Sequence, residues 1–233
     1  MDKDFIDEHK TIKRDVKRRV AMIIIQLLFG LSLLFGISGD ITYIGAWLLG
    51  GLYVICYIFY GLFLPKKVII ARSTKVTHQP TYEKVLQIPM LLFGYGTYVV
   101  AALDKRMNWT MEIPWYMLIL ASAIFLMGMG IVLWSMSENP YFNQKVSTEE
   151  KHEVIVTGPY AVIRHPGYLG MMTYLTVVPL ILESLFAMIP TVCLIICFII
   201  RTNLEDKYLK DHLEGYQDYQ KQVKKRLFRT YKS

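Results

Sequence analysis

The sequence predicts an all-α, polytopic integral membrane protein: a helical bundle of four transmembrane spans followed by a C-terminal helical hairpin. Hydrophobic residues make up 54% of the 233 residues and the mean hydropathy is positive, which is unusual for a soluble domain of this size. Four apolar runs reach about 20 residues, the length that crosses roughly 30 Å of hydrocarbon. Basic residues gather at one set of span ends, as membrane topology favours.

The four long apolar runs lie near residues 20–38, 41–64, 85–103 and 114–136. The first two connect through a tight Ser38-Gly39-Asp40 turn, which predicts an antiparallel pair. Two shorter apolar pieces follow, near residues 168–182 and 185–200, joined at Glu183-Ser184. At about 1.5 Å per residue, each piece falls short of a full crossing unless flanking turns extend it, so together they predict a tilted helical hairpin.

The chain carries 26 Lys and Arg against 19 Asp and Glu, and the basic residues are concentrated in three segments. These are the N-terminal 19 residues, the loop at residues 66–75 and the tail at residues 221–229. With the N-terminus in the cytoplasm, all three segments lie on the cytoplasmic face, as the positive-inside bias expects. We therefore expect both termini in the cytoplasm and anionic membrane lipids as partners of the basic segments. This explanation of the charge is favoured over nucleic-acid binding, so no nucleic-acid partner is expected.

Two regions are expected along the chain. Residues 1–136 hold the charged N-terminal segment and the four spans, and residues 137–233 form the second region: a long polar loop, the hairpin and a helical tail. A loop of that length is functional or disordered, and the extended run at residues 154–156 favours order. All three cysteines lie within apolar runs, so no metal site is predicted. No ladder of carboxylates inside the spans marks an ion path, which lowers the expectation of a transporter.

The most unusual stretch is TGPYAVIRHPGYLG, residues 157–170, because it places charged residues and a Gly/Pro frame between two apolar segments. Pro166 has the position of a first helical residue, and a helix N-terminus offers free N–H groups beside Arg164 and His165. Such a setting suits a carboxylate or phosphate. In the structural alternative, Arg164 reaches lipid phosphate and His165 caps its own helix. Tyr160 and Tyr168 are either interfacial anchors or aromatic faces for a cation or an adenine ring.

Arg201 and Glu205 lie one helical turn apart, beyond the second apolar piece of the hairpin. They could form an intrahelical salt bridge, worth only about 0.3 kcal/mol. A hairpin brings its ends together, however, and this would place both residues near His165 and Tyr168. A cation and a carboxylate beside a Tyr/His/Arg cluster indicate a ligand with charges of both signs.

Three motifs in this order resemble the isoprenylcysteine carboxyl methyltransferase family, and the resemblance covers residues 134–226. The motifs are His152-x-Val154-x-x-x-Gly158-Pro159-Tyr160, Arg164-His165-Pro166-x-Tyr168 and Arg201-x-x-x-Glu205-Asp206, followed by Gly215-Tyr216-Gln217-Asp218-Tyr219 in the tail. The chain departs from the family at Asp206, where a second Glu is frequent, and at Lys145, near the place where some members have a Gln that contacts the cofactor.

The resemblance implies S-adenosylmethionine as cofactor and a cytoplasmic cofactor site. It implies that the cofactor is lined by His152, Glu153, Val154 and Ile155, and that its pocket is completed by Tyr160, His165, Pro166, Gly167, Tyr168 and Glu205. Arg201 would orient the acceptor and neutralise a carboxylate on it. Arg164, which lies in the motif of His165 and Tyr168, is a further catalytic candidate.

The methyl acceptor is left open by the sequence. A carboxylate is already nucleophilic at neutral pH, which suits a site without an obvious catalytic dyad, and the carboxylate of a lipophilic isoprenylcysteine-like compound is favoured. A phospholipid amine or a small thiol would need a base, for which His165 or His152 is available. The apolar spans predict a lipophilic acceptor entering from the bilayer and a cofactor entering from the cytoplasm. A transporter or membrane scaffold is the alternative from a different class.

Overall fold

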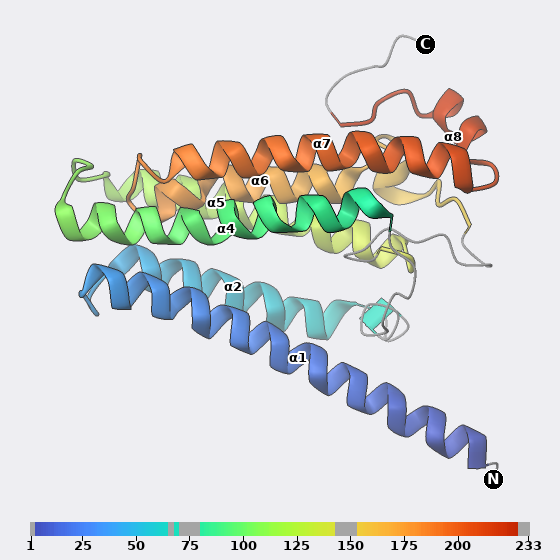
Figure 1. Ribbon diagram of the computed structural model, residues 1–233, viewed down its shortest axis with the longest axis horizontal. Coiled ribbons are helices and arrows are strands. Elements are labelled where there is room, and N and C mark those ends of the chain that lie inside the picture. Colours follow the sequence, from blue (N-terminus) through green and yellow to red (C-terminus); the bar gives the residue numbers. More distant parts are fainter. Residues whose placement is uncertain (1–2, 65–67, 70–79, 143–152, 228–233) are drawn as a thin grey trace.

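The structure is a computed structural model that describes residues 3–64, 68–69, 80–142 and 153–227, with the backbone alone for residues 3–12. Its elements over these ranges are helices (Figure 1), and five of them are long and apolar enough to cross a membrane. The five are α1 (Lys3–Ser38), α2 (Ile44–Phe63), α4 (Thr81–Met107), α5 (Trp115–Glu138) and α7 (Met188–His212). The shorter elements are η1 (Gly158–Ala161), α6 (Pro166–Ile181) and α8 (Tyr216–Gln222). The predicted all-α polytopic membrane fold is confirmed.

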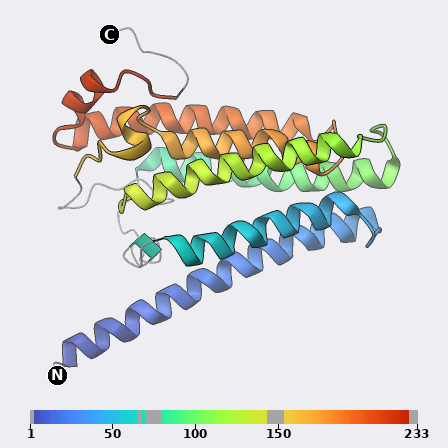
Figure 2. The same cartoon turned by 180° about the vertical axis from the view of Figure 1, so that it is seen from behind.

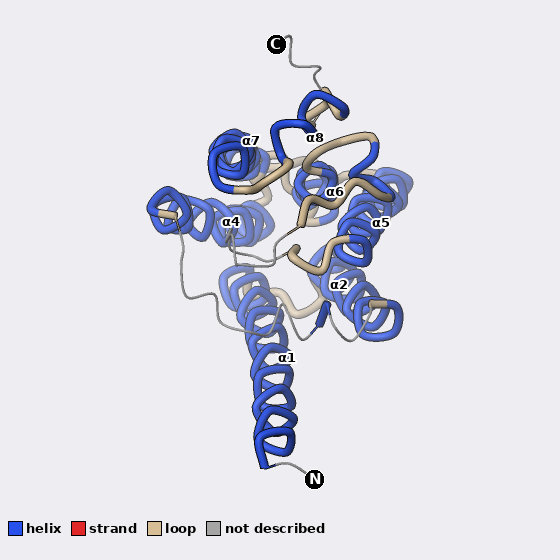
Figure 3. The backbone as a smooth tube through the Cα atoms, turned by 90° about the vertical axis from the view of Figure 1, so that its right-hand side faces the viewer, coloured by secondary structure: helices blue, strands red, loops and turns tan. Residues whose placement is uncertain are grey.

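The helices form two layers, which Figures 1 and 2 show from opposite sides. Helices α4, α5, α6 and α7 lie together in one layer, and the antiparallel pair α1 and α2 forms the other. Viewed from the end in Figure 3, α6 lies between α5 and α7. The N-terminal part of α1 extends away from the bundle, so the charged N-terminal segment is continuous with the first span.

The C-terminal hairpin is asymmetric. Helix α6 has 16 residues, close to the predicted apolar piece, whereas α7 has 25 residues and continues well past Ile200. The flanking turns therefore extend α7 to the length of a membrane span. Hydropathy could not reveal this extension, because the added residues include charged side chains that contact partners inside the protein.

Helices α5 and α6 approach each other closely where two glycines meet. A Cβ atom on Gly170 would lie 2.6 Å from the carbonyl oxygen of Gly128, and one on Gly128 would lie 2.6 Å from the backbone nitrogen of Tyr174. Only residues without a side chain allow this contact, as is common between helices in membranes. The close packing fixes the position of α6, whose first turn carries the polar motif.

At the end of the bundle opposite this motif, Asp104 of α4 is buried and ties two connections together. Its carboxylate accepts hydrogen bonds from the backbone nitrogen and hydroxyl of Thr110, at 2.7 and 2.5 Å, and from the hydroxyl of Ser184, at 2.5 Å. Ser184 lies in the turn between α6 and α7, and Thr110 in the loop before α5. Polar groups thus hold the far ends of α4 and α7 in place.

Candidate functional site

The polar motif at residues 157–170 begins with a turn that requires glycine. Gly158 has a φ of +55°, in the left-handed region, and a Cβ atom there would lie 2.6 Å from the side chain of Glu138. The hydroxyl of Thr157 donates to Glu138 at 2.8 Å. This turn leads into η1, with Pro159 near its start, and fixes the motif against the end of α5.

Helix α6 begins at Pro166, as the sequence predicts, but His165 does not cap it. No side-chain cap hydrogen bond forms at this N-terminus. The imidazole of His165 instead lies between two carboxylates, with Nε2 at 3.0 Å from Asp206 and Nδ1 at 3.9 Å from Glu205. Arg164 is likewise buried, with 6% of its surface exposed, and faces Asp206 instead of extending along the surface. The structural alternative for Arg164 and His165 is therefore wrong.

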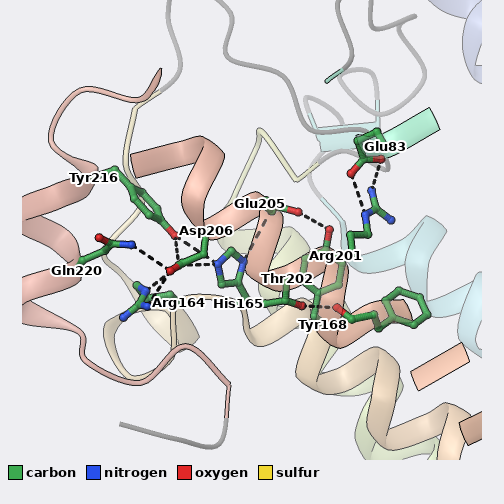
Figure 4. Close-up of polar contacts among 11 residues, drawn as sticks. Glu83, Arg164, His165, Tyr168, Arg201, Thr202, Glu205, Asp206, Tyr216 and Gln220 are labelled. Carbon is green, nitrogen blue, oxygen red and sulfur yellow. Dashed lines mark hydrogen bonds and ion pairs between the residues drawn. The ribbon is translucent and has the colours of Figure 1, made fainter. Parts of the chain in front are cut away.

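Asp206 is the centre of a buried hydrogen-bond network (Figure 4). Arg164 donates to both of its oxygens, from Nε at 2.9 Å and Nη2 at 3.0 Å. The hydroxyl of Tyr216 and the amide of Gln220 also donate to it, at 2.8 and 3.0 Å. Burial opposes the charge of Arg164, but the hydrogen bonds and charge attraction of Asp206, together with Tyr216, outweigh it and raise the pKa of the guanidinium. Burial and then the Asp206 carboxylate raise the pKa of Tyr216, so its hydroxyl remains protonated.

The C-terminal tail folds back over the motif and completes the network. Nη1 of Arg164 donates to the carbonyl of Val223 at 2.7 Å. The backbone nitrogens of Arg164 and His165 donate to the carbonyls of Lys225 and Arg226, at 3.0 and 3.2 Å. The hydroxyl of Tyr219 donates to the carbonyl of Tyr160 at 2.7 Å, which joins α8 to η1. The tail is thus a structural part of the site.

The hairpin does bring Glu205 to the motif, as predicted. The hydroxyl of Tyr168 donates to Glu205 at 2.5 Å, and the rings of His165 and Tyr168 lie 5.9 Å apart. The guanidinium of Arg201 lies over the ring of Tyr168, 5.5 Å from its centroid. Tyr168 therefore contacts both Arg201 and Glu205 of α7.

Arg201 also has a partner that the sequence did not indicate. Glu83, in the first turn of α4, accepts hydrogen bonds from Nε and Nη2 of Arg201, both at 2.9 Å. The side chains of Arg201 and Glu83 are only 12% and 8% exposed. The one available signal was a single carboxylate at the start of an apolar span, and it did not specify which residue of α7 would face it.

A cavity of about 500 Å³ joins these groups. Its lining includes ten of the predicted site residues: Glu153, Val154, Ile155, Tyr160, Arg164, His165, Gly167, Tyr168, Arg201 and Glu205. Pro166 is buried at the start of α6 and is not part of the lining, and His152, like Lys145, lies outside the described residues. Lining residues that sequence reasoning missed include Glu83, Gln87, Asn139, Phe142, Tyr216 and Tyr219. Among the residues that the structure describes, no group of three or more His, Cys, Asp or Glu could hold a metal ion.

The cavity continues towards the centre of the bundle. A second cavity, of about 290 Å³, lies among α1, α2, α4, α6 and α7. The two cavities share six lining residues: Gln26, Met90, Leu91, Tyr174, Leu175 and Leu194. The charged end of the site is therefore adjacent to a largely apolar space within the bundle.

Comparisons with known proteins agree with this architecture. A family model described as the isoprenylcysteine carboxyl methyltransferase (ICMT) family matches residues 117–211. The chain is similar in structure to a eukaryotic intramembrane Ras methyltransferase, ICMT, with a TM-score of 0.52 and 20% sequence identity, over 88% of this chain and 75% of that one. A search of curated proteins found no match. The chain thus resembles the isoprenylcysteine carboxyl methyltransferase family over α5 to α7, and it shares its fold with a solved member of that family.

Proposed function

We propose that the protein is an S-adenosylmethionine-dependent methyltransferase that methylates the carboxylate of a lipophilic, isoprenylcysteine-like acceptor. The observation that carries this proposal is the arrangement of one face of α7. Leu194, Phe198, Arg201 and Glu205 follow one another at helical spacing, and all of them line the cavity. A single helix thus presents apolar, cationic and anionic groups in sequence to one space.

The polar end of the cavity has the charges that S-adenosylmethionine requires. Its lining includes the carboxylates of Glu153 and Glu205, which favour a ligand with a cationic group, whereas the carboxylate of Glu83 is paired with Arg201. Glu205 and Glu153 are suited to its ammonium group, and the ring of Tyr168 to a cationic centre. The backbone of Val154 and Ile155 offers partners for its polar groups. When bound, this cofactor supplies a methyl group activated by its sulfonium.

The surroundings of His165 favour a carboxylate acceptor over an amine or thiol. Its Nε2 is 3.0 Å from Asp206 and its Nδ1 faces Glu205, so both ring nitrogens are directed at carboxylates of the protein. Because both ring nitrogens face carboxylates of the protein, neither is directed at an acceptor bound beside Arg201. A carboxylate needs only desolvation and alignment, to which Arg201 and the apolar lining would contribute. The phospholipid amine and the small thiol become alternative outcomes of the acceptor assay below.

The proposed function also implies a membrane topology. The basic segments and the polar end of the cavity would face the cytoplasm, with both termini on that side and anionic lipids around the basic residues. Residues 137–233 would form the catalytic region, and residues 1–136 the membrane scaffold. The scaffold also contributes to the site through Glu83 and Gln26, which line the cavity. The adjoining apolar space supports entry of the acceptor from the bilayer.

Calorimetry with S-adenosylmethionine on detergent-purified protein tests the cofactor assignment. We expect binding by the wild type, loss of binding in Glu205→Ala and Tyr168→Ala, and unchanged binding in Glu112→Ala. Glu112 is an exposed residue in the loop between α4 and α5 and serves as a matched control. A folded wild type that binds no S-adenosylmethionine would overturn the enzyme assignment and favour a transporter or scaffold.

Assays of methyl transfer then test the acceptor. An S-prenylated N-acetylcysteine is compared with phosphatidylethanolamine and with a small alkyl thiol under the same conditions. We expect product only from the prenylated carboxylate. Transfer to the amine or the thiol alone would replace the proposed acceptor by one of the two alternatives.

A further inference from the structure

The Arg201–Glu83 ion pair lies where the cavity changes from polar to apolar. On α7, Phe198 lines the cavity on the bundle side of Arg201, and Glu205 lines it on the other side. On α4, which runs antiparallel to α7, Glu83 and Met90 line the same space in the matching order. An acceptor whose apolar chain extends into the bundle would therefore place its polar head at Arg201.

Glu83 already occupies the carboxylate-binding edge of Arg201. Its two oxygens accept from Nε and Nη2 at 2.9 Å each, the paired geometry by which a guanidinium recognises carboxylates in general. The backbone nitrogen of Glu83 donates to the carbonyl of Pro80 at 3.1 Å, so the residue is held at the start of α4. Glu83 thus presents to Arg201 the same chemical group as the proposed acceptor.

We propose that Glu83 is an internal competitor: a carboxylate that any acceptor carboxylate must displace from Arg201, which weakens the binding of every carboxylate by the same factor. This inference rests on the proposed carboxyl methyltransferase function. Displacement exchanges one charge-assisted pair for another, so the cost of releasing Glu83 has to be offset by other contacts. Burial of the acceptor's apolar chain supplies them, at about 25 cal/mol per Å² of surface removed from water. Short, soluble carboxylates lack this surface and therefore bind more weakly.

The variant Glu83→Gln tests the proposal, because it keeps the shape of the side chain and removes the competing charge. We expect the KM for an S-prenylated N-acetylcysteine to fall about tenfold, equivalent to about 1.4 kcal/mol. The KM for a short S-alkyl N-acetylcysteine should fall by the same factor, because the same displacement step is removed. The affinity for S-adenosylmethionine should not change, and Glu112→Gln should behave as the wild type.

A ligand control separates carboxylate competition from other effects. The carboxamide analogue of the prenylated compound does not compete for a guanidinium as an anion, so its inhibition constant should be the same in the wild type and in Glu83→Gln. An equal tenfold gain for this analogue would overturn the proposal. A KM for the carboxylate that is unchanged or raised, with cofactor binding retained, would also overturn it and make Glu83 a positioning residue for Arg201.

Glu83→Asp covers the case in which Glu83→Gln does not fold. It keeps the charge but shortens the side chain, so we expect a smaller decrease in the KM, and an unchanged or raised KM would overturn the proposal. A wild-type protein that binds S-adenosylmethionine but methylates no carboxylate would overturn the proposed acceptor instead. These results therefore distinguish an error about Glu83 from an error about the acceptor.

Discussion

Both ends of the bundle contain a buried aspartate, but the two are satisfied by different kinds of group. Asp104, 1% exposed, accepts hydrogen bonds from two hydroxyls and one backbone nitrogen in the connections at the far end. Asp206, 6% exposed, binds the guanidinium of Arg164 and lies beside His165 at the edge of a cavity. At the Asp104 end the hydrogen-bond donors are uncharged, whereas at the Asp206 end charged partners line a cavity. The far end therefore serves stability, and the Asp206 end combines stability with the candidate site.

The largest effect on stability and binding is expected for Asp206→Ala. The substitution leaves the buried Arg164 without its carboxylate, which we expect to destabilise the protein by about 3–5 kcal/mol and to abolish cofactor binding. Thermal unfolding in detergent and calorimetry with S-adenosylmethionine measure the two effects. Asp206→Glu keeps the charge and should retain binding. If Asp206→Ala bound the cofactor normally, the network would be a structural feature separate from the site.

At the far end, Asp104→Ala should reduce stability without affecting the site. Removal of the carboxylate leaves the hydroxyls of buried Ser184 and half-buried Thr110 without their acceptor, at a cost of about 2 kcal/mol. Thermal unfolding should show this loss, while the affinity for S-adenosylmethionine should stay within twofold of the wild type. A large loss of cofactor affinity in folded Asp104→Ala protein would show that the two ends are coupled.

The smallest expected effect is that of Tyr216→Phe. This change removes one donor to Asp206 and keeps the ring, and Arg164 and Gln220 continue to donate. We expect a loss of about 1 kcal/mol in stability and no more than a few-fold weaker cofactor binding. An effect as large as that of Asp206→Ala would mean that Tyr216 itself contacts the cofactor.

The sequence predicted most of the fold, because membrane spans follow from apolar runs of sufficient length. The four predicted runs correspond to α1, α2, α4 and α5, and Pro166 begins α6 as expected. The length of α7 was underestimated, since Arg201 and Glu205 end the apolar run without ending the helix. Their charges are tolerated because Glu83 and Tyr168 bind them, and hydropathy along the chain contains no information on such partners.

The candidate site could be predicted only in part, for a similar reason. The approach of Glu205 to Tyr168 followed from the hairpin, since the two ends of a hairpin must meet. The pairing of Arg201 with Glu83 depends on how α4 packs against α7, and the central role of Asp206 depends on how the tail folds back. Both are tertiary relationships between segments far apart in the chain. Tyr216 is part of the tail pattern, but no role for it could be assigned from the pattern alone.

Three carbonyl oxygens of the tail, at Val223, Lys225 and Arg226, hold the guanidinium and backbone of the motif. Every amino acid carries such a carbonyl, so this contact can persist while the side chains of the tail vary freely. The family match ends at residue 211, before these positions. Comparisons by residue type would undervalue a segment of this kind, and a C-terminus shortened before Val223 would remove these three acceptors of the motif while deleting few characteristic residues.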